Sequence, residues 1–191
     1  MIEIEGLKKR FGQSIALDEV SMHVRDGAMY GFVGPNGAGK TTTIRCMMGL
    51  LAADGGKLLI NGIDMEKEPK KALSQIGYIP DDFGVYDNLK VLEYMEFFAS
   101  CYGSTGLSAR KRSMTLLDQV GLEGKSDFYV DSLSKGMKQR LCLARALVHN
   151  PSILIMDEPT AGLDPRTRVE FKEILKDLKD QKKTVFISSH I

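Results

Sequence analysis

The stretch GPNGAGKTT, residues 34–42, constrains this chain more than any other segment. It stands between a short apolar run, AMYGFVG, and a helical pattern that we predict over 40–51. Glycines at 34, 37 and 39 let a loop turn its backbone N–H groups toward an anion, and the following helix N-terminus adds positive potential. A buried strand, such a loop and a helix in this order predict a phosphate-binding loop in an α/β fold, with a plain glycine-rich turn as the alternative.

The loop predicts a role for each of its polar side chains. Lys40 would pair with β- and γ-phosphate oxygens, Thr41 would be a protein ligand of Mg²⁺, and Thr42 would bind a further phosphate oxygen. The predicted nucleotide cradle comprises Gly34, Pro35, Asn36, Gly37, Ala38, Gly39, Lys40, Thr41 and Thr42.

Two adjacent carboxylates end the second apolar run, SILIMDE. Ligands of open α/β sheets bind at the carboxyl ends of the strands, so Asp157 and Glu158 are expected at a site there. We predict that Asp157 holds Mg²⁺ through its water shell and that Glu158 polarises the water that attacks the γ-phosphate. The alternative for this segment alone is a strand end with two solvated acids.

Hydrophobic patterning predicts two kinds of strand. IEIEGL and VSMHVRDG alternate apolar and polar residues, and KLLING adds a short strand, which together indicate an antiparallel layer. AMYGFVG, SILIMDE and TVFISSH are continuous apolar runs, typical of parallel strands buried on both faces.

Five helices are predicted between these strands, and three of them follow one another without an intervening strand. Ser108 is the expected N-cap of the helix predicted over 109–120, and Asp164 is the expected N-cap of the last helix. The predicted ranges are 40–51, 91–102, 109–120, 135–149 and 165–180. We therefore expect one domain over 1–191, with a catalytic core and antiparallel β subdomain from 1–80 and 151–191 and an inserted helical subdomain from 81–150.

Composition narrows the possible function classes. A chain of 191 residues with 43% hydrophobic residues supports one main domain. A net charge of +1 disfavours nucleic acid as the main partner. Cys46, Cys101 and Cys142 have no metal-binding spacing, so we expect reduced thiols in apolar surroundings in a reducing cytoplasm. The sequence contains neither a signal-peptide pattern nor a run of about 18 apolar residues, so we expect no membrane span.

Several motifs in one order resemble the nucleotide-binding subunit of an ABC transporter over nearly the whole chain. Besides GPNGAGKTT and ILIMDEP, the sequence has LSKGMKQR upstream of the acidic strand, AGLD after it, and a histidine at the end of TVFISSH. The resemblance implies a P-loop ATPase core that binds ATP and Mg²⁺ and hydrolyses ATP.

In this family two subunits pack head to tail. Each ATP lies between the phosphate loop of one subunit and, in the other, the start of the helix that carries LSKGMKQR, a motif called the signature. The resemblance therefore implies that Ser134, Lys135, Gly136 and Asp164 act on a nucleotide held by the partner, and that a side chain at Gly136 would block the approach. A plain serine cap is the alternative for Ser134, and Asp164 is also a good N-cap by its local chemistry.

Two further roles rest on the same resemblance. His190 matches the switch histidine that contacts the γ-phosphate and orders the attacking water, with a polar strand end as the alternative. Phe11 matches the aromatic residue that stacks on adenine, although a core or surface aromatic residue is also compatible with its position.

The chain departs from the family pattern at three places. Asp81 follows IGYIP where the family usually has glutamine, and we hypothesise that it keeps a metal role and alters the timing of hydrolysis. Lys135 and Met137 replace the more common glycine and glutamine of the signature. The sequence stops one residue after His190, where family members continue, so we expect a fragment of a longer protein.

The resemblance also implies partners. The transport pathway would belong to separate membrane-spanning subunits, so this subunit would lie in the cytoplasm, peripheral on the inner face of the membrane. The segment DDFGVYDNLKVLEYMEFFASCYG is the expected docking element, although most of Tyr94, Phe97, Phe98 and Tyr102 are expected in the core. The residues and spacing of this segment resemble bacterial exporters more than importers. The competing classes are a soluble ABC ATPase that acts on ribosomes or DNA and a nucleotide sensor without hydrolysis, which Glu158 and His190 oppose.

Overall fold

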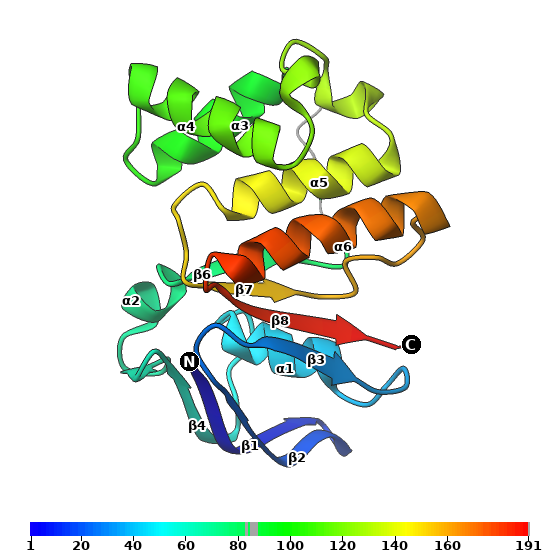
Figure 1. Ribbon diagram of the computed structural model, residues 1–191. Helices are drawn as coiled ribbons and strands as arrows, with labels where there is room; N and C mark the ends of the chain where they lie inside the picture. Colours follow the sequence, from blue (N-terminus) through cyan, green and yellow to red (C-terminus); the bar gives the residue numbers. More distant parts are fainter. Residues whose placement is uncertain (83, 85–87, 191) are drawn as a thin grey trace.

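The structure, a computed structural model, describes residues 1–82, 84 and 88–190 (Figure 1). Its strands form two sheets, each with four strands in the described part of the chain. The antiparallel sheet has the order β2-β1-β4-β5, and the parallel sheet has the order β3-β8-β7-β6. The strands are β1 (Ile2–Phe11), β2 (Ser14–Val24), β3 (Met29–Val33), β4 (Gly55–Ile60), β5 (Ile63–Asp64), β6 (Ile76–Ile79), β7 (Ile153–Met156) and β8 (Thr184–Ser189).

The helices stack in layers on the parallel sheet. In Figure 1, α1 lies between the two sheets, α5 and α6 lie side by side across the other face of the parallel sheet, and α3 and α4 lie beyond α5. The helices are α1 (Lys40–Met47), α2 (Pro69–Leu73), α3 (Val91–Cys101), α4 (Gly106–Gln119), α5 (Lys135–Ala146) and α6 (Pro165–Asp180), with 3₁₀ turns η1 (Glu123–Lys125) and η2 (Val130–Ser132).

Strand β7 explains why its sequence is continuously apolar. Leu154 and Met156 belong to the hydrophobic core under α5 and α6, whereas Ile153 and Ile155 belong to a second core between the two sheets. All four side chains are fully buried. Because successive side chains of a strand point to opposite faces, a strand between two cores has no polar face.

The predicted α/β class, the antiparallel layer and the three successive helices are all present. Helix α6 has the predicted bounds, but α1 ends at Met47, before Gly49 with its left-handed φ of +63°. Helix α5 ends three residues earlier than predicted, at Ala146. The prediction of Ser108 as an N-cap is wrong, because α4 begins at Gly106. Strand β5 and helix α2 were not predicted, since both are too short to show a periodic pattern.

The cysteines follow the prediction in part. All three are free, and Cys46 and Cys142 are buried, so that burial raises the pKa of the Cys142 thiol to about 11. Cys101 is exposed at the last position of α3, so the prediction of apolar surroundings is wrong for this residue. No helix in the described part of the chain combines the length and hydrophobicity that a membrane span requires.

Candidate functional site

The carboxyl ends of the parallel strands bring four segments of the sequence together. Val33 at the end of β3 pairs with Ser189 of β8, and Met156 at the end of β7 pairs with Ile79 of β6. The residues that follow these strands are the loop 34–39, the 80–82 segment, the Asp157–Glu158 pair and His190. Because the strands are parallel, these segments meet at one edge of the sheet.

The close approach of the phosphate loop to β2 requires glycine at position 39. Gly39 has φ +86°, and a Cβ there would lie 2.6 Å from the Ala16 carbonyl oxygen and 2.7 Å from Leu17 Cδ2. Gly39 is the N-cap of α1 and provides no side-chain cap. The N-terminus of α1 therefore keeps backbone N–H groups for an anion.

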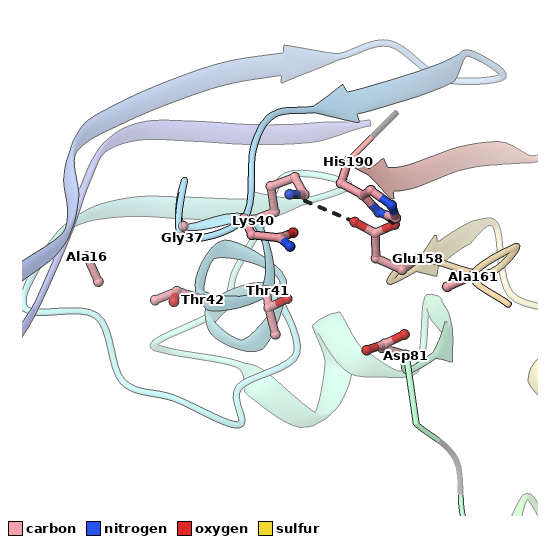
Figure 2. Close-up of a pocket in the computed structure, with 11 residues that line it drawn as sticks. Ala16, Gly37, Lys40, Thr41, Thr42, Asp81, Glu158, Ala161 and His190 are labelled. Carbon is pink, nitrogen blue, oxygen red and sulfur yellow. Dashed lines mark hydrogen bonds and ion pairs between the residues drawn. The ribbon is translucent and has the colours of Figure 1, made fainter.

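A cavity of about 390 Å³ opens at this edge (Figure 2). The predicted residues that line it come from the loop, from the 80–82 segment and from the ends of β7 and β8. The lining comprises Ala16, Asn36, Gly37, Gly39, Lys40, Thr41, Thr42, Asp81, Glu158, Ala161 and His190.

Lys40, Glu158 and His190 form one cluster of ionisable side chains in the cavity. The buried Lys40 donates from Nζ to the carbonyl oxygens of Gly34, at 2.7 Å, and Pro35, at 3.1 Å. Its Nζ lies 3.8 Å from Glu158 Oε1, and His190 Nδ1 lies 2.7 Å from Glu158 Oε2. Figure 2 shows Lys40 and His190 both reaching toward the Glu158 carboxylate. The cluster places a cation and an imidazole on a carboxylate that faces the phosphate loop.

Ser188, which the sequence analysis missed, holds the two adjacent acids in place. Its fully buried hydroxyl donates to Asp157 Oδ1 at 2.6 Å and accepts the Glu158 N–H at 2.9 Å. Glu158 has φ +48°, a left-handed conformation that is strained for a residue with a side chain. The serine bond therefore fixes a backbone conformation that turns Glu158 toward the cavity while Asp157 stays buried.

Thr41 and Asp81 line the same cavity, and their side-chain oxygens suit a hard divalent cation. Asp157 is 1% exposed, and burial followed by the neighbouring charges of Asp157 and Glu158 raises the pKa of Asp81. Within the described residues no group of three or more His, Cys, Asp or Glu side chains forms a metal cluster by itself. Mg²⁺ in nucleotide sites typically takes one or two protein oxygens and completes its shell with phosphates and water. Thr41 and Asp81 of the cavity lining fit this requirement, whereas Asp157 lies outside the lining and would act only through water.

The predicted signature residues lie outside the cavity lining. Ser134 caps α5, because its hydroxyl oxygen accepts the Met137 N–H at 3.3 Å. Asp164 caps α6 and uses both carboxylate oxygens, one for the Thr167 N–H at 3.0 Å and the other for the Thr167 hydroxyl at 2.6 Å. These bonds lower the pKa of Asp164. The local cap roles that the sequence left open are thus present for both residues.

The remaining predicted residues are placed as follows. Phe11 is 52% exposed at the end of β1, with Lys9 Nζ 5.7 Å from its ring centroid, and does not line the cavity. Gly34, Pro35, Ala38 and Asp157 also lie outside the lining. Ala16 and Ala161 line the cavity but carry no chemical group that sequence reasoning could have singled out.

Comparison with known proteins identifies related chains. Residues 17–161 match the family described as "ABC transporter". The chain is 37% identical over 190 residues to the "Linearmycin resistance ATP-binding protein LnrL" of Bacillus subtilis (strain 168), covering 100% of this chain and 61% of that protein. It is 38% identical over 190 residues to the "Probable multidrug ABC transporter ATP-binding protein YbhF" of Escherichia coli (strain K12), covering 100% of this chain and 33% of that protein. This chain thus spans about three fifths or less of the length of these curated relatives.

Solved structures of ABC ATP-binding proteins have the same fold as this chain. The "Dimeric structure of a post-hydrolysis state of the ATP-binding cassette MJ0796 bound to ADP and Pi" superposes with a TM-score of 0.88 at 29% identity, covering 100% of this chain and 88% of that one. The "Structure of ATP binding subunit of ABC transporter" superposes with a TM-score of 0.86 at 31% identity, covering 100% of this chain and 79% of that one. The predicted resemblance is therefore confirmed by both sequence and fold.

Proposed function

The chain belongs to the ABC transporter family of ATP-binding proteins, and on this premise we propose that it binds and hydrolyses ATP to power a membrane exporter. The observation that carries the proposal is the cavity in which the phosphate loop faces Glu158 and His190. An anion-binding loop opposite a carboxylate–imidazole pair suits a reaction in which water attacks a bound phosphoryl group.

The residues of the cavity divide the work of hydrolysis. The N–H groups of the loop and the Lys40 ammonium bind the phosphates. Glu158 accepts a proton from the attacking water, and His190 orients that carboxylate and the water. Mg²⁺, held by Thr41, Asp157 and Asp81, would neutralise phosphate charge. Phe11, which is exposed at the end of β1, would stack on the adenine ring.

We further propose a head-to-tail dimer in which the nucleotide bridges two subunits. Ser134, Lys135, Gly136 and Asp164 lie together at the starts of α5 and α6, outside their own subunit's cavity lining, as expected for residues that act on the partner's nucleotide. The similar cassette whose title names a dimer bound to ADP and Pi supports this arrangement.

A groove between the core and the outer helices is the proposed docking place for a membrane subunit. It has a volume of about 330 Å³ between the end of α1, β6, α3 and α5. Of the aromatic residues in the predicted docking segment, Tyr94 is fully buried and Phe98 is partly buried, whereas Phe97 and Tyr102 are 46% and 54% exposed. Residues 83 and 85–87 of that segment lie outside the described residues. Phe98 and Tyr102 line the groove and would contact the partner.

The names of the relatives favour export as the direction. They describe linearmycin resistance, a multidrug transporter and Nod factor export. The proposed subunit would then lie in the cytoplasm on the inner face of the membrane. The alternative, an ABC ATPase that acts on ribosomes or DNA, is disfavoured by a net charge of only +1.

The proposal is tested by replacing Glu158 with glutamine and measuring molar mass by light scattering with and without Mg-ATP. Glutamine keeps the side-chain shape but is a poor base, so ATP remains unhydrolysed and a dimer should accumulate. Lys40→Ala in the same Glu158→Gln background is the control, because it removes the phosphate-binding cation. A Glu158→Gln protein that binds Mg-ATP and stays a monomer would contradict the proposed dimer, and one that binds no ATP would contradict the proposed function.

A further inference from the structure

The start of α5 and the turn before α6 touch each other through two glycines. Gly136 in the first turn of α5 faces Thr167 in the first turn of α6. Gly162, in the turn that precedes α6, faces the ammonium group of Lys135. Each segment thus offers a glycine to a side chain of the other.

The contact at Gly136 leaves no room for a side chain. A Cβ on Gly136 would overlap Thr167 Cγ2 and would lie 3.2 Å from Thr167 Oγ1. Thr167 is not free to move away, because its backbone N–H and its hydroxyl are both bonded to Asp164. The glycine of the signature is therefore required within the subunit, independently of any nucleotide approaching from a partner.

In the second contact the roles of the two segments are reversed, because the glycine precedes α6 and the side chain belongs to α5. Gly162 has φ +66°, and a Cβ there would overlap Lys135 Nζ. Lys135 is one of the two signature residues that depart from the common family pattern. A signature with the common glycine at this position could not make this contact. The two contacts join residues 134–137 to residues 162–167 at two points, and we call this pair of contacts the clasp.

We propose that Thr167 is a positioning residue that clasps the signature segment to the turn before α6, so that Ser134 and Asp164 reach a partner's nucleotide as one rigid unit. The functional part of this inference rests on the proposed ATP-driven dimer. The clasp itself is a property of the single subunit.

Thermal unfolding without nucleotide tests the clasp. In an unconstrained helix Gly→Ala raises stability, because alanine has the higher helix propensity. Overlap with Thr167 reverses the sign here, so Gly136→Ala should lower Tm by about 5 °C. Thr167→Ser removes the overlapping methyl and keeps the hydroxyl that bonds Asp164, so Gly136→Ala should no longer lower Tm in the Thr167→Ser background. Gly124→Ala, where the new Cβ meets nothing within 4 Å, is the matched control.

Dimer formation tests the positioning role. In the Glu158→Gln background with Mg-ATP, Thr167→Ser alone should raise the dissociation constant of the dimer by about tenfold, because it removes the methyl that contacts Gly136 while it leaves Gly136 open to the partner's nucleotide. An unchanged dimer in the Thr167→Ser variant would overturn the positioning role.

The two levels of failure are distinguishable. If Gly136→Ala raises Tm or leaves it unchanged, or if Thr167→Ser does not rescue it, the clasp is overturned whatever the dimer does. If the parent Glu158→Gln protein binds no Mg-ATP and forms no dimer, the proposed function fails, while the Tm comparison still decides the clasp.

Discussion

His190 Nδ1 lies 2.7 Å from Glu158 Oε2, although the two residues, which follow β8 and β7, are 32 positions apart in the chain. The other carboxylate oxygen, Oε1, lies 3.8 Å from Lys40 Nζ. Each oxygen of Glu158 therefore has its own partner, Lys40 at the start of α1 for one and His190 after the end of β8 for the other. This arrangement holds the carboxylate in one orientation and directs it toward the phosphate loop.

The first prediction concerns this pair. His190→Ala should lower kcat for ATP by about 10²-fold, because the carboxylate loses the group that orients it, and Glu158→Gln should lower it by about 10³-fold or more. Neither substitution should change the Kd for ATP by more than about threefold, because the phosphates are bound by the loop. Steady-state ATPase assays and equilibrium binding provide the two readouts. Unchanged turnover in His190→Ala would contradict a role for the imidazole in hydrolysis.

The second prediction separates backbone strain from backbone contact in the phosphate loop. Gly37 and Gly39 both have positive φ, at +82° and +86°, but a Cβ on Gly37 meets nothing within 4 Å. Alanine at either position should cost about 1 kcal/mol of folding free energy for the left-handed conformation. Gly39→Ala should cost a further ~2 kcal/mol, because its Cβ would press on the Ala16 carbonyl and Leu17. Urea unfolding without nucleotide measures both, and equal losses would refute the contact argument.

Most polar residues of the cavity lining could be predicted from sequence because their signals are local. Glycine spacing, a lysine and threonines in series, and two acids after an apolar run are each visible in fewer than about ten residues. Because the strands are parallel, the carboxyl ends of β3, β6, β7 and β8 then lie at one edge of the sheet. The role of His190 was implied only by family resemblance, and its contact with Glu158 was not predicted.

Other features could not be read from the sequence because they depend on tertiary contacts. Ser188 is one of two successive serines in β8, and only the fold places its hydroxyl between Asp157 and the Glu158 N–H. The contact between Gly136 and Thr167 joins two helix starts that are 31 positions apart in the chain. Cys101 was expected in apolar surroundings but lies at an exposed helix end, where composition gives no signal.

The third prediction concerns Asp81, the acid found where the family usually has glutamine. The structure places it in the same cavity as Thr41 and Glu158. An amide is a weaker Mg²⁺ ligand than a carboxylate, so Asp81→Gln should raise the Mg²⁺ concentration needed for half-maximal turnover by about 3- to 10-fold. Asp82→Asn, at an exposed neighbouring position, is the control and should leave it unchanged. If Asp81→Gln changes neither the Mg²⁺ requirement nor turnover, Asp81 only links the catalytic core to the helical subdomain.

The fourth prediction links His149 to stability at low pH. His149 Nε2 donates to the Ile76 carbonyl at 2.9 Å, its ring stacks on Tyr102 at 4.1 Å, and its Nδ1 is buried without a partner among the described residues. Burial lowers the pKa of His149, and the positive charges of Lys183 and Arg112 lower it further. The folded state therefore favours the neutral ring, whereas the unfolded chain takes up a proton near the ordinary histidine pKa of about 6.5.

The sign of the pH effect follows from this difference. Because the unfolded state binds more protons below pH ~6.5, His149 makes the protein less stable as the pH falls from about 6.5 toward its lower folded pKa. His149→Phe retains a ring against Tyr102 but cannot titrate, and it should lower Tm at pH 8 because the bond to Ile76 is lost. Its further loss of Tm between pH 7.5 and 5.5 should be about 1–3 °C smaller than that of the unsubstituted protein. Carboxylates titrate in both proteins, so the difference isolates His149. Equal slopes of Tm against pH would mean that the buried ring accepts a proton without cost to the fold.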